Sequence, residues 1–313
     1  MGLGVSFGRA RRYTQFVSPA VIAFAFDPVL RLGDLEFRVQ TVVLAGIILA
    51  ALLLTARIGR LTPQDSPYVP PPTLRPDDIP FLVLGIVPGA VIGGRLEYVL
   101  LHADYYAANP TAIVDPAQGS LALGLAVLGG MLGGIAIARL VGAPADRWMH
   151  AATLPVLFVL AAGKLVSVLT AEGQGLPSDL PWATAYTGPG PWGSLAPDVP
   201  SHPSQVYEAI ATTIVLTFLG LALRLGAFAR RDGSALLVAV VLWAIGRGIV
   251  AVTWRDAAVL GPLNAEQLIL IAVVVACGVA LVVLARRRVA EPAGSSGPRT
   301  ELSWPSPESR PRF

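Results

Sequence analysis

The sequence predicts an all-α integral membrane protein with seven transmembrane helices and a long outer loop between helices four and five. Composition is the first reason: 54% of the 313 residues are hydrophobic and 14% are charged, whereas soluble domains usually carry about 25% charged residues. The mean hydropathy of +0.65 agrees with this. The second reason is a set of apolar stretches of about 20 residues, the length that crosses a bilayer as a helix. They lie at 39–57, 80–101, 120–142, 150–170, 206–225, 234–253 and 267–285.

The distribution of arginine gives the expected orientation of these spans. Basic residues gather in alternate loops, and such loops usually face the cytoplasm. The loops 102–119 and 171–204 contain no Lys or Arg, so we expect them outside. The same rule places the N-terminus outside and the C-terminus in the cytoplasm. Arg9, Arg11 and Arg12 run against this orientation at the N-terminus.

Three segments are expected along the chain. Residues 1–38 form an N-terminal interfacial segment, because two prolines interrupt the apolar stretch 17–32 and favour an interfacial or re-entrant entry. Residues 39–285 form the seven-helix transmembrane domain. Residues 286–313 are rich in Pro, Ser and Arg and predict a disordered cytoplasmic tail. The single cysteine, Cys277, excludes a disulfide within the chain and is expected to be an apolar helix residue.

Ionisable residues inside spans are costly and therefore indicate function. Lys164 and Arg255 both lie towards the expected outer side, where two cations facing one cavity suit an anionic head group. Arg95 and Glu97 can be part of a site, or can form a salt bridge that neutralises both. The ionisable residues considered within or at the ends of the spans are Arg95, Glu97, Lys164, Glu208, Arg247 and Arg255.

Glycines in the second and third spans are four residues apart. "PGAVIGGRL" and "VLGGMLGGI" repeat small residues at positions 89 and 93, and at 129 and 133. This spacing lets helix backbones approach closely, so tight packing of the two spans is expected for most of these glycines. Contact with a ligand is the alternative.

Other functional classes find no support in the sequence. The formal net charge of +3 gives no footprint for nucleic acid, and no phosphate-binding loop or nucleophile elbow is present. His102, His150 and His202 are too scattered to indicate a metal site. We therefore expect no cofactor, no metal and no nucleic acid partner.

A polar cluster, "SHPSQVYEA" at 201–209, stands at the mouth of the fifth span. His202 and Pro203 are expected to end the outer loop, and Ser204 to cap the helix that follows. Gln205, Tyr207 and Glu208 would then face the neighbours of the first helical turn.

These segments resemble, in order, the sequence patterns of the prolipoprotein diacylglyceryl transferases, bacterial inner-membrane enzymes with seven spans. The strongest match is "HPSQVYE" at 202–208, which agrees with H-P-[ST]-Q-L-Y-E at six of seven places. The resemblance covers roughly residues 26 to 285. The other matching segments are "FDPVL" at 26–30, "GGRLEYVL" at 93–100 (G-G-R-x-G-Y-V-L), "LGGMLGG" at 128–134 (H-G-G-L-I-G), "GKLVSVLTAEGQGLPSDLPW" at 163–182 (G-R-x-G-N-F-x-N-x-E-x-x-G-x-P-T-x-L-P-W), "GRGIVAVTWR" at 246–255 (G-R-F-x-x-E-x-x-R) and "EQLIL" at 266–270 (G-Q-x-x-S).

The resemblance implies a reaction and its partners. The family transfers a diacylglyceryl group from phosphatidylglycerol to the thiol of the lipobox cysteine in a lipoprotein precursor, and glycerol phosphate leaves. The expected partners are therefore phosphatidylglycerol, lipobox-containing precursors and membrane lipids, in a bacterial cytoplasmic membrane. Lys164 and Arg255 would bind the phosphate, and Glu208, His202 or Glu172 would orient the thiol or help to deprotonate it.

Several family residues are replaced in this chain. The family histidine is Leu128, the arginine of the fourth span is Lys164, and the glutamate of the sixth span is Ala251. Two further readings therefore stay open beside a divergent active transferase: a paralogue that has lost the chemistry and binds or moves phospholipid, and a structural partner in a membrane complex. The substrate-binding residues that the resemblance implies are Lys164, Arg255, Arg247, Ser167, Gln205, Tyr207, Arg95, Gly94, Gly129, Gly130 and Gln267.

Overall fold

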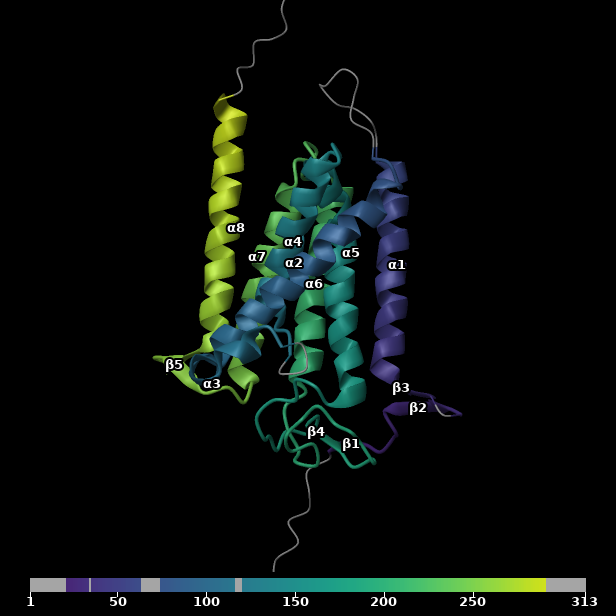
Figure 1. Cartoon of the computed structure of the whole chain (residues 1–313), viewed down its shortest axis with the longest axis vertical. Coiled ribbons are helices and arrows are strands. Elements are labelled where there is room, and N and C mark those ends of the chain that lie inside the picture. Colours follow the sequence, from purple (N-terminus) through teal and green to yellow (C-terminus); the bar gives the residue numbers. More distant parts are fainter. Residues whose placement is uncertain (1–20, 34, 63–73, 116–119, 291–313) are drawn as a thin grey trace, which may run out of the picture.

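The structure is a computed structural model that describes residues 21–33, 35–62, 74–115 and 120–290. In this part of the chain, seven helices are long and apolar enough to cross a membrane, as the hydropathy predicted. Figure 1 shows them side by side as a bundle. They are α1 (Val39–Leu61), α2 (Asp78–Leu101), α4 (Leu123–Leu140), α5 (Ala145–Val166), α6 (Ser204–Arg224), α7 (Ser234–Val250) and α8 (Ala265–Ala290).

Two helix ends differ from the predicted spans by five residues. α5 begins five residues before the predicted start at 150, because Arg147 and Trp148 of its first turn are buried by partners that hydropathy does not take into account. Trp148 of that turn donates from Nε1 to Oδ2 of Asp78 at the start of α2, over 3.1 Å. At the other end of the chain, α8 continues to Ala290. The segment 286–290 is therefore helical, and the remainder of the predicted tail lies outside the described residues.

Short strands lie at one end of the bundle, called here the strand end (Figure 1). β1 (Ile22–Phe24) pairs in parallel with β4 (Thr184–Tyr186) of the outer loop. β2 (Val29–Leu32) and β3 (Leu35–Arg38) form an antiparallel hairpin. The described part of the predicted interfacial segment thus contains the three short strands β1, β2 and β3. The remaining elements at this end are α3 (Ala103–Ala108), η1 (Pro110–Ile113), η2 (Ser167–Thr170), η3 (Ala251–Thr253), β5 (Ala258–Leu260) and β6 (Leu263–Asn264).

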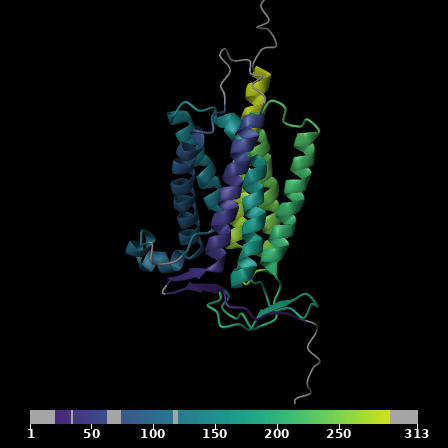
Figure 2. The same cartoon turned by 90° about the vertical axis from the view of Figure 1, so that its right-hand side faces the viewer.

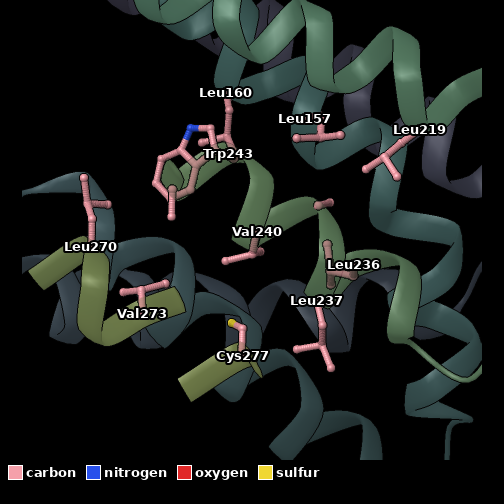
Figure 3. Packing of buried hydrophobic residues seen from close by; sticks show 12 residues of the cluster. Leu157, Leu160, Leu219, Leu236, Leu237, Val240, Trp243, Leu270, Val273 and Cys277 are labelled. Carbon is pink, nitrogen blue, oxygen red and sulfur yellow. The ribbon is translucent and has the colours of Figure 1, made fainter. Parts of the chain in front are cut away.

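The hydrophobic core lies among α5, α6, α7 and α8. Leu157, Leu219, Trp243 and Val273 are each at most 2% exposed and come from these four helices. Figure 3 shows these side chains within one packed cluster. Cys277 is 1% exposed in the same cluster, which confirms that it is an apolar helix residue. This core fixes the four helices whose strand ends hold the charged side chains described below.

Glycines join α2 to α4, as their spacing predicted. A Cβ atom at Gly89 would lie 2.3 Å from the carbonyl oxygen of Gly129, and one at Gly85 would lie 2.3 Å from that of Gly133. Real Cβ atoms do not approach backbone that closely, so only glycine allows this helix contact. The two helices are seen side by side in Figure 1, and Figure 2 shows the bundle turned by 90°. Gly129 therefore serves helix packing.

Candidate functional site

Four charged side chains from four helices form a linked cluster at the strand end. The Nζ atom of Lys164 (α5) lies 3.2 Å from Oε1 of Glu208 (α6), and Arg247 (α7) bonds the other oxygen of Glu208 through Nη1. Arg247 also donates from Nε and Nη2 to Oε1 of Glu266 (α8), over 3.0 and 2.8 Å. We call Lys164, Glu208, Arg247 and Glu266 the charge network.

The charge network is held away from solvent and lipid. The side chains of Glu208, Arg247 and Glu266 are 3%, 7% and 5% exposed, and that of Lys164 is 19% exposed. Buried charges persist only when they are paired and hydrogen-bonded. The members of the network meet this condition because each charge is in direct contact with an opposite charge. Lys164 is the most exposed member and is therefore the cation that an anionic ligand can reach.

Glu97 of α2 lies beside this network. Its Oε2 atom accepts from the backbone N of Leu125 over 2.7 Å, at the first turn of α4, and the charges of Glu266 and Arg247 both act on the carboxyl group. Of the two possibilities left open for Arg95 and Glu97, the described side chains do not form the salt bridge with each other. Arg95 donates from Nε to the carbonyl oxygen of Ile113 over 2.8 Å, because side chains two residues apart on a helix point to different sides.

The "HPSQVYE" segment connects the outer loop to the helices. Ser204 is the first residue of α6, and Pro203 occupies the cap position, so the prediction that Ser204 caps the helix is wrong. Its Oγ atom instead lies 2.7 Å from Oγ1 of Thr253. Tyr207 accepts from Nε1 of Trp182 over 2.7 Å, and Nδ1 of His202 lies 3.4 Å from the same hydroxyl. The segment thus positions Glu208 near the start of α6 and also holds the outer loop through the contact between Tyr207 and Trp182.

Gln205 is joined to strand β4 of the outer loop by a buried hydrogen bond. Its Nε2 atom donates to the hydroxyl of Tyr186 over 3.2 Å, and both side chains are buried. Burial raises the pKa of Tyr186 to about 12, against a smaller lowering by the Gln205 hydrogen bond. Tyr186 therefore stays a neutral hydroxyl, and the contact with Gln205 is a structural one.

Arg255 is bound to the outer loop. It donates from Nε to the carbonyl oxygen of Gly175 over 2.6 Å and from Nη2 to Oγ of Ser201 over 3.0 Å. Gly175 has no room for a side chain, since a Cβ atom there would lie 2.2 Å from Oγ of Ser204. The cation that shares Glu208 with Lys164 is Arg247, rather than the Arg255 that the sequence paired with Lys164 as a phosphate site.

The other predicted site residues serve mainly as connections between segments. Glu172 accepts from Nε2 of Gln40 over 2.9 Å and so joins the outer loop to the start of α1. Ser167 donates to the carbonyl oxygen of Gly163. Gln267 donates from Nε2 to the carbonyl oxygen of Gly248 over 2.9 Å, which joins α8 to α7.

An apolar cavity of about 460 Å³ lies among α1, α2, α4, α5 and α7. Gly130 lines it, whereas Gly94 packs against Ala122 and Ala126 at the start of α4. Leu160 also lines the cavity and precedes Lys164 by one helical turn. The cavity therefore extends close to the cationic end of the charge network.

Sequence reasoning missed Glu266 as a site residue and left the role of Glu97 open. Both stand where the family patterns quoted above have glycine: Glu97 in "GGRLEYVL" and Glu266 in "EQLIL". Two acidic residues in place of glycine within apolar surroundings were a signal that could have identified them. Within the described ranges, no cluster of three or more His, Cys, Asp or Glu side chains is arranged to hold a metal ion.

Fold and site together define a multi-pass membrane protein in which buried charges adjoin an apolar cavity. The family model for prolipoprotein diacylglyceryl transferase matches residues 28–284. Three relatives are called phosphatidylglycerol–prolipoprotein diacylglyceryl transferase. The one from Ruegeria pomeroyi is 35% identical over 217 residues, which is 64% of this chain and 70% of the relative. That from Geobacter sulfurreducens is 31% identical over 69% of this chain and 75% of the relative.

The third relative, from Methylocella silvestris, is 30% identical over 293 residues, which is 88% of this chain and 100% of the relative. The family match thus includes the first six membrane-spanning helices, most of α8 and the outer loop that carries "HPSQVYE". The chain belongs to the prolipoprotein diacylglyceryl transferase family.

Proposed function

We propose that this protein transfers the diacylglyceryl group of phosphatidylglycerol to the lipobox cysteine thiol of lipoprotein precursors. The observation that carries the proposal is the placement of Lys164 and Arg247 around Glu208, next to an apolar cavity. The reaction needs cations for a phosphate and an apolar space for acyl chains, and the two lie within one helical turn of each other. The family membership gives the reaction class.

Lys164 is proposed to bind the phosphate, with Arg247 behind it. Cations held in a low-dielectric site stabilise the charge that develops on a leaving phosphate. Both oxygens of Glu208 are bound by these cations, so its role is to hold them in place. His202 and Glu172 are proposed to orient the incoming thiol segment at the mouth of the site.

Arg255 is proposed to act through the loop. Its bonds to Gly175 and Ser201 hold the outer loop against the helix ends, and this loop covers the strand end of the bundle (Figure 1). Tyr207, Gln205, Ser167 and Gln267 are proposed to support the same arrangement. Arg95 holds the segment around Ala112 and Ile113 at this end.

The strand end is proposed to face the outside of a bacterial cytoplasmic membrane. The helix ends and loops of the opposite end carry arginines, including Arg60, Arg139 and Arg224, and basic loops usually stay in the cytoplasm. The C-terminus of α8 then lies in the cytoplasm and the N-terminal strands outside. This orientation presents the charge network to secreted precursors and to lipid head groups of the outer leaflet.

The proposal predicts that Lys164→Gln abolishes transfer while Lys164→Arg retains part of it, because arginine restores the cation. The assay uses the purified protein in phosphatidylglycerol vesicles with a lipobox peptide, and measures the thioether product and released glycerol phosphate. Arg224→Gln, which removes an exposed cation at the opposite end, is the matched control and should be unaffected. Unchanged product with Lys164→Gln would contradict the assignment. Lipid binding by the wild type without any product would favour the lipid-binding paralogue instead.

A further inference from the structure

Glu97 has a carboxylate oxygen, Oε1, that receives no hydrogen bond from a described donor, although the carboxyl group lies close enough to Glu266 of the charge network for the two to share a proton. The side chain is fully buried, at 0% exposure. Among the residues that the structure describes, its Oε1 atom has no hydrogen-bond donor. A buried polar atom without a partner is costly, so such an atom in a native protein calls for an explanation. The other oxygen, Oε2, is anchored on Leu125 N, which fixes the direction of the free one.

The surroundings of Oε1 leave space for one proton, and the charged groups nearby carry a net negative charge that one proton would neutralise. A Cβ atom on Gly124 would lie 2.6 Å from Oε1, so glycine at 124 makes room for the carboxyl group. The charged groups around it are Arg247 of α7 and Glu266 of α8. Arg247 is in turn bound to Glu208, which pairs with Lys164. Three acids, Glu97, Glu208 and Glu266, face two cations, an excess of one negative charge. Uptake of one proton would make the group neutral as a whole.

The free oxygen also lies where the side chain at position 128 is directed. Gly124 and Leu128 are one helical turn apart on the same face of α4. Helical side chains lean towards the N-terminus, so a side chain at 128 covers the turn that contains Gly124. The family pattern has histidine at 128 and glycine at 97, whereas this chain has leucine and glutamate. A histidine at 128 would thus reach the same space that Oε1 of Glu97 occupies.

We propose that Glu97 is the proton acceptor of the transfer in this protein. The inference rests on the proposed function, since the proton comes from the precursor thiol. The S–H bond breaks as Oε1 takes the proton, and the sulfur electron pair forms the new C–S bond to the glyceryl carbon. The C–O bond to phosphate breaks at the same carbon, and glycerol phosphate leaves with its electrons towards Lys164.

The test compares Glu97→Gln with the double variant Glu97→Gln, Leu128→His in phosphatidylglycerol vesicles. Glutamine still accepts from Leu125 N but takes up no proton, so transfer should fall by a factor of about 10²–10⁴. The added histidine should restore it. Restored transfer should decline as the pH drops through about 6.5, because only neutral imidazole accepts a proton. Asp104→Asn, at an exposed acid near the same end, is the control and should be unchanged.

Bound phosphatidylglycerol is measured for each variant as a second readout. Loss of transfer with lipid binding retained, and its recovery with Leu128→His, supports the proposal. Full activity of Glu97→Gln overturns it, and so does loss of lipid binding together with transfer, which indicates a purely structural role. A wild type that binds lipid without transfer overturns the proposed function itself. If Leu128→His alone then confers transfer, the native chain lacks an acceptor and the role of Glu97 is also refuted.

Discussion

Replacing Glu208 with alanine is expected to lower the free energy of unfolding by about 3–5 kcal/mol and to abolish transfer. The carboxylate bridges Lys164 and Arg247 in a buried position, and removal of one partner leaves buried cations facing each other. The loss is to be measured as the shift of thermal unfolding in detergent supplemented with phosphatidylglycerol, and by the transfer assay.

The matched control for this variant is Glu36→Ala. Glu36 also pairs with an arginine, Arg31, over 3.1 Å, but both side chains are more than half exposed. Exposed pairs contribute about 0–1 kcal/mol, so this variant should unfold almost as the wild type does. Equal effects of the two substitutions would show that the buried network does not support the fold.

Gly89→Val is expected to destabilise the protein by at least about 1–3 kcal/mol, the usual cost of overpacking a tight interface. A Cβ atom at this position would lie 2.3 Å from the carbonyl oxygen of Gly129, and a backbone atom cannot rotate away as the end of a flexible side chain can. Thermal unfolding in detergent is the measurement. Gly46→Ala in α1 is the control, because a Cβ atom there meets nothing within 4 Å. It should be neutral or slightly stabilising, and a normal unfolding temperature for Gly89→Val would contradict the close helix contact.

Most of the fold could be predicted because the membrane imposes a simple rule. Backbone groups in lipid must be paired internally, so each apolar stretch of sufficient length became a helix, and α1 and α7 begin at the predicted residues 39 and 234. The parallel pairing of β1 with β4 could not be predicted. It joins Ile22–Phe24 to Thr184–Tyr186 across a large separation in sequence, and three-residue strands leave no periodic pattern.

The site was only partly predictable, for a related reason. Lys164, Glu208 and Arg247 were identified because charges inside spans are rare and costly. The sequence could not predict which of these side chains contact one another, because contacts between helices depend on helix rotation and tilt, which hydropathy does not specify. Arg255 therefore received a phosphate role while the structure binds it to Gly175. Glu266 was missed because it lies at the very start of α8, where a charged residue looks like ordinary solvation of a helix end.

The glycine contact between α2 and α4 bears on the reaction as well as on packing. Because Gly85, Gly89 and Gly93 bring the two backbones together, the helices form one stiff unit. Glu97 is on one of them and its anchor, Leu125 N, is on the other. The orientation of its carboxyl group is therefore set before any substrate arrives, and no reorganisation is needed at the moment of reaction. A catalytic group preorganised in this way depends on small residues far from the chemistry, so the glycines towards the opposite end of the bundle help to determine the precision of the site.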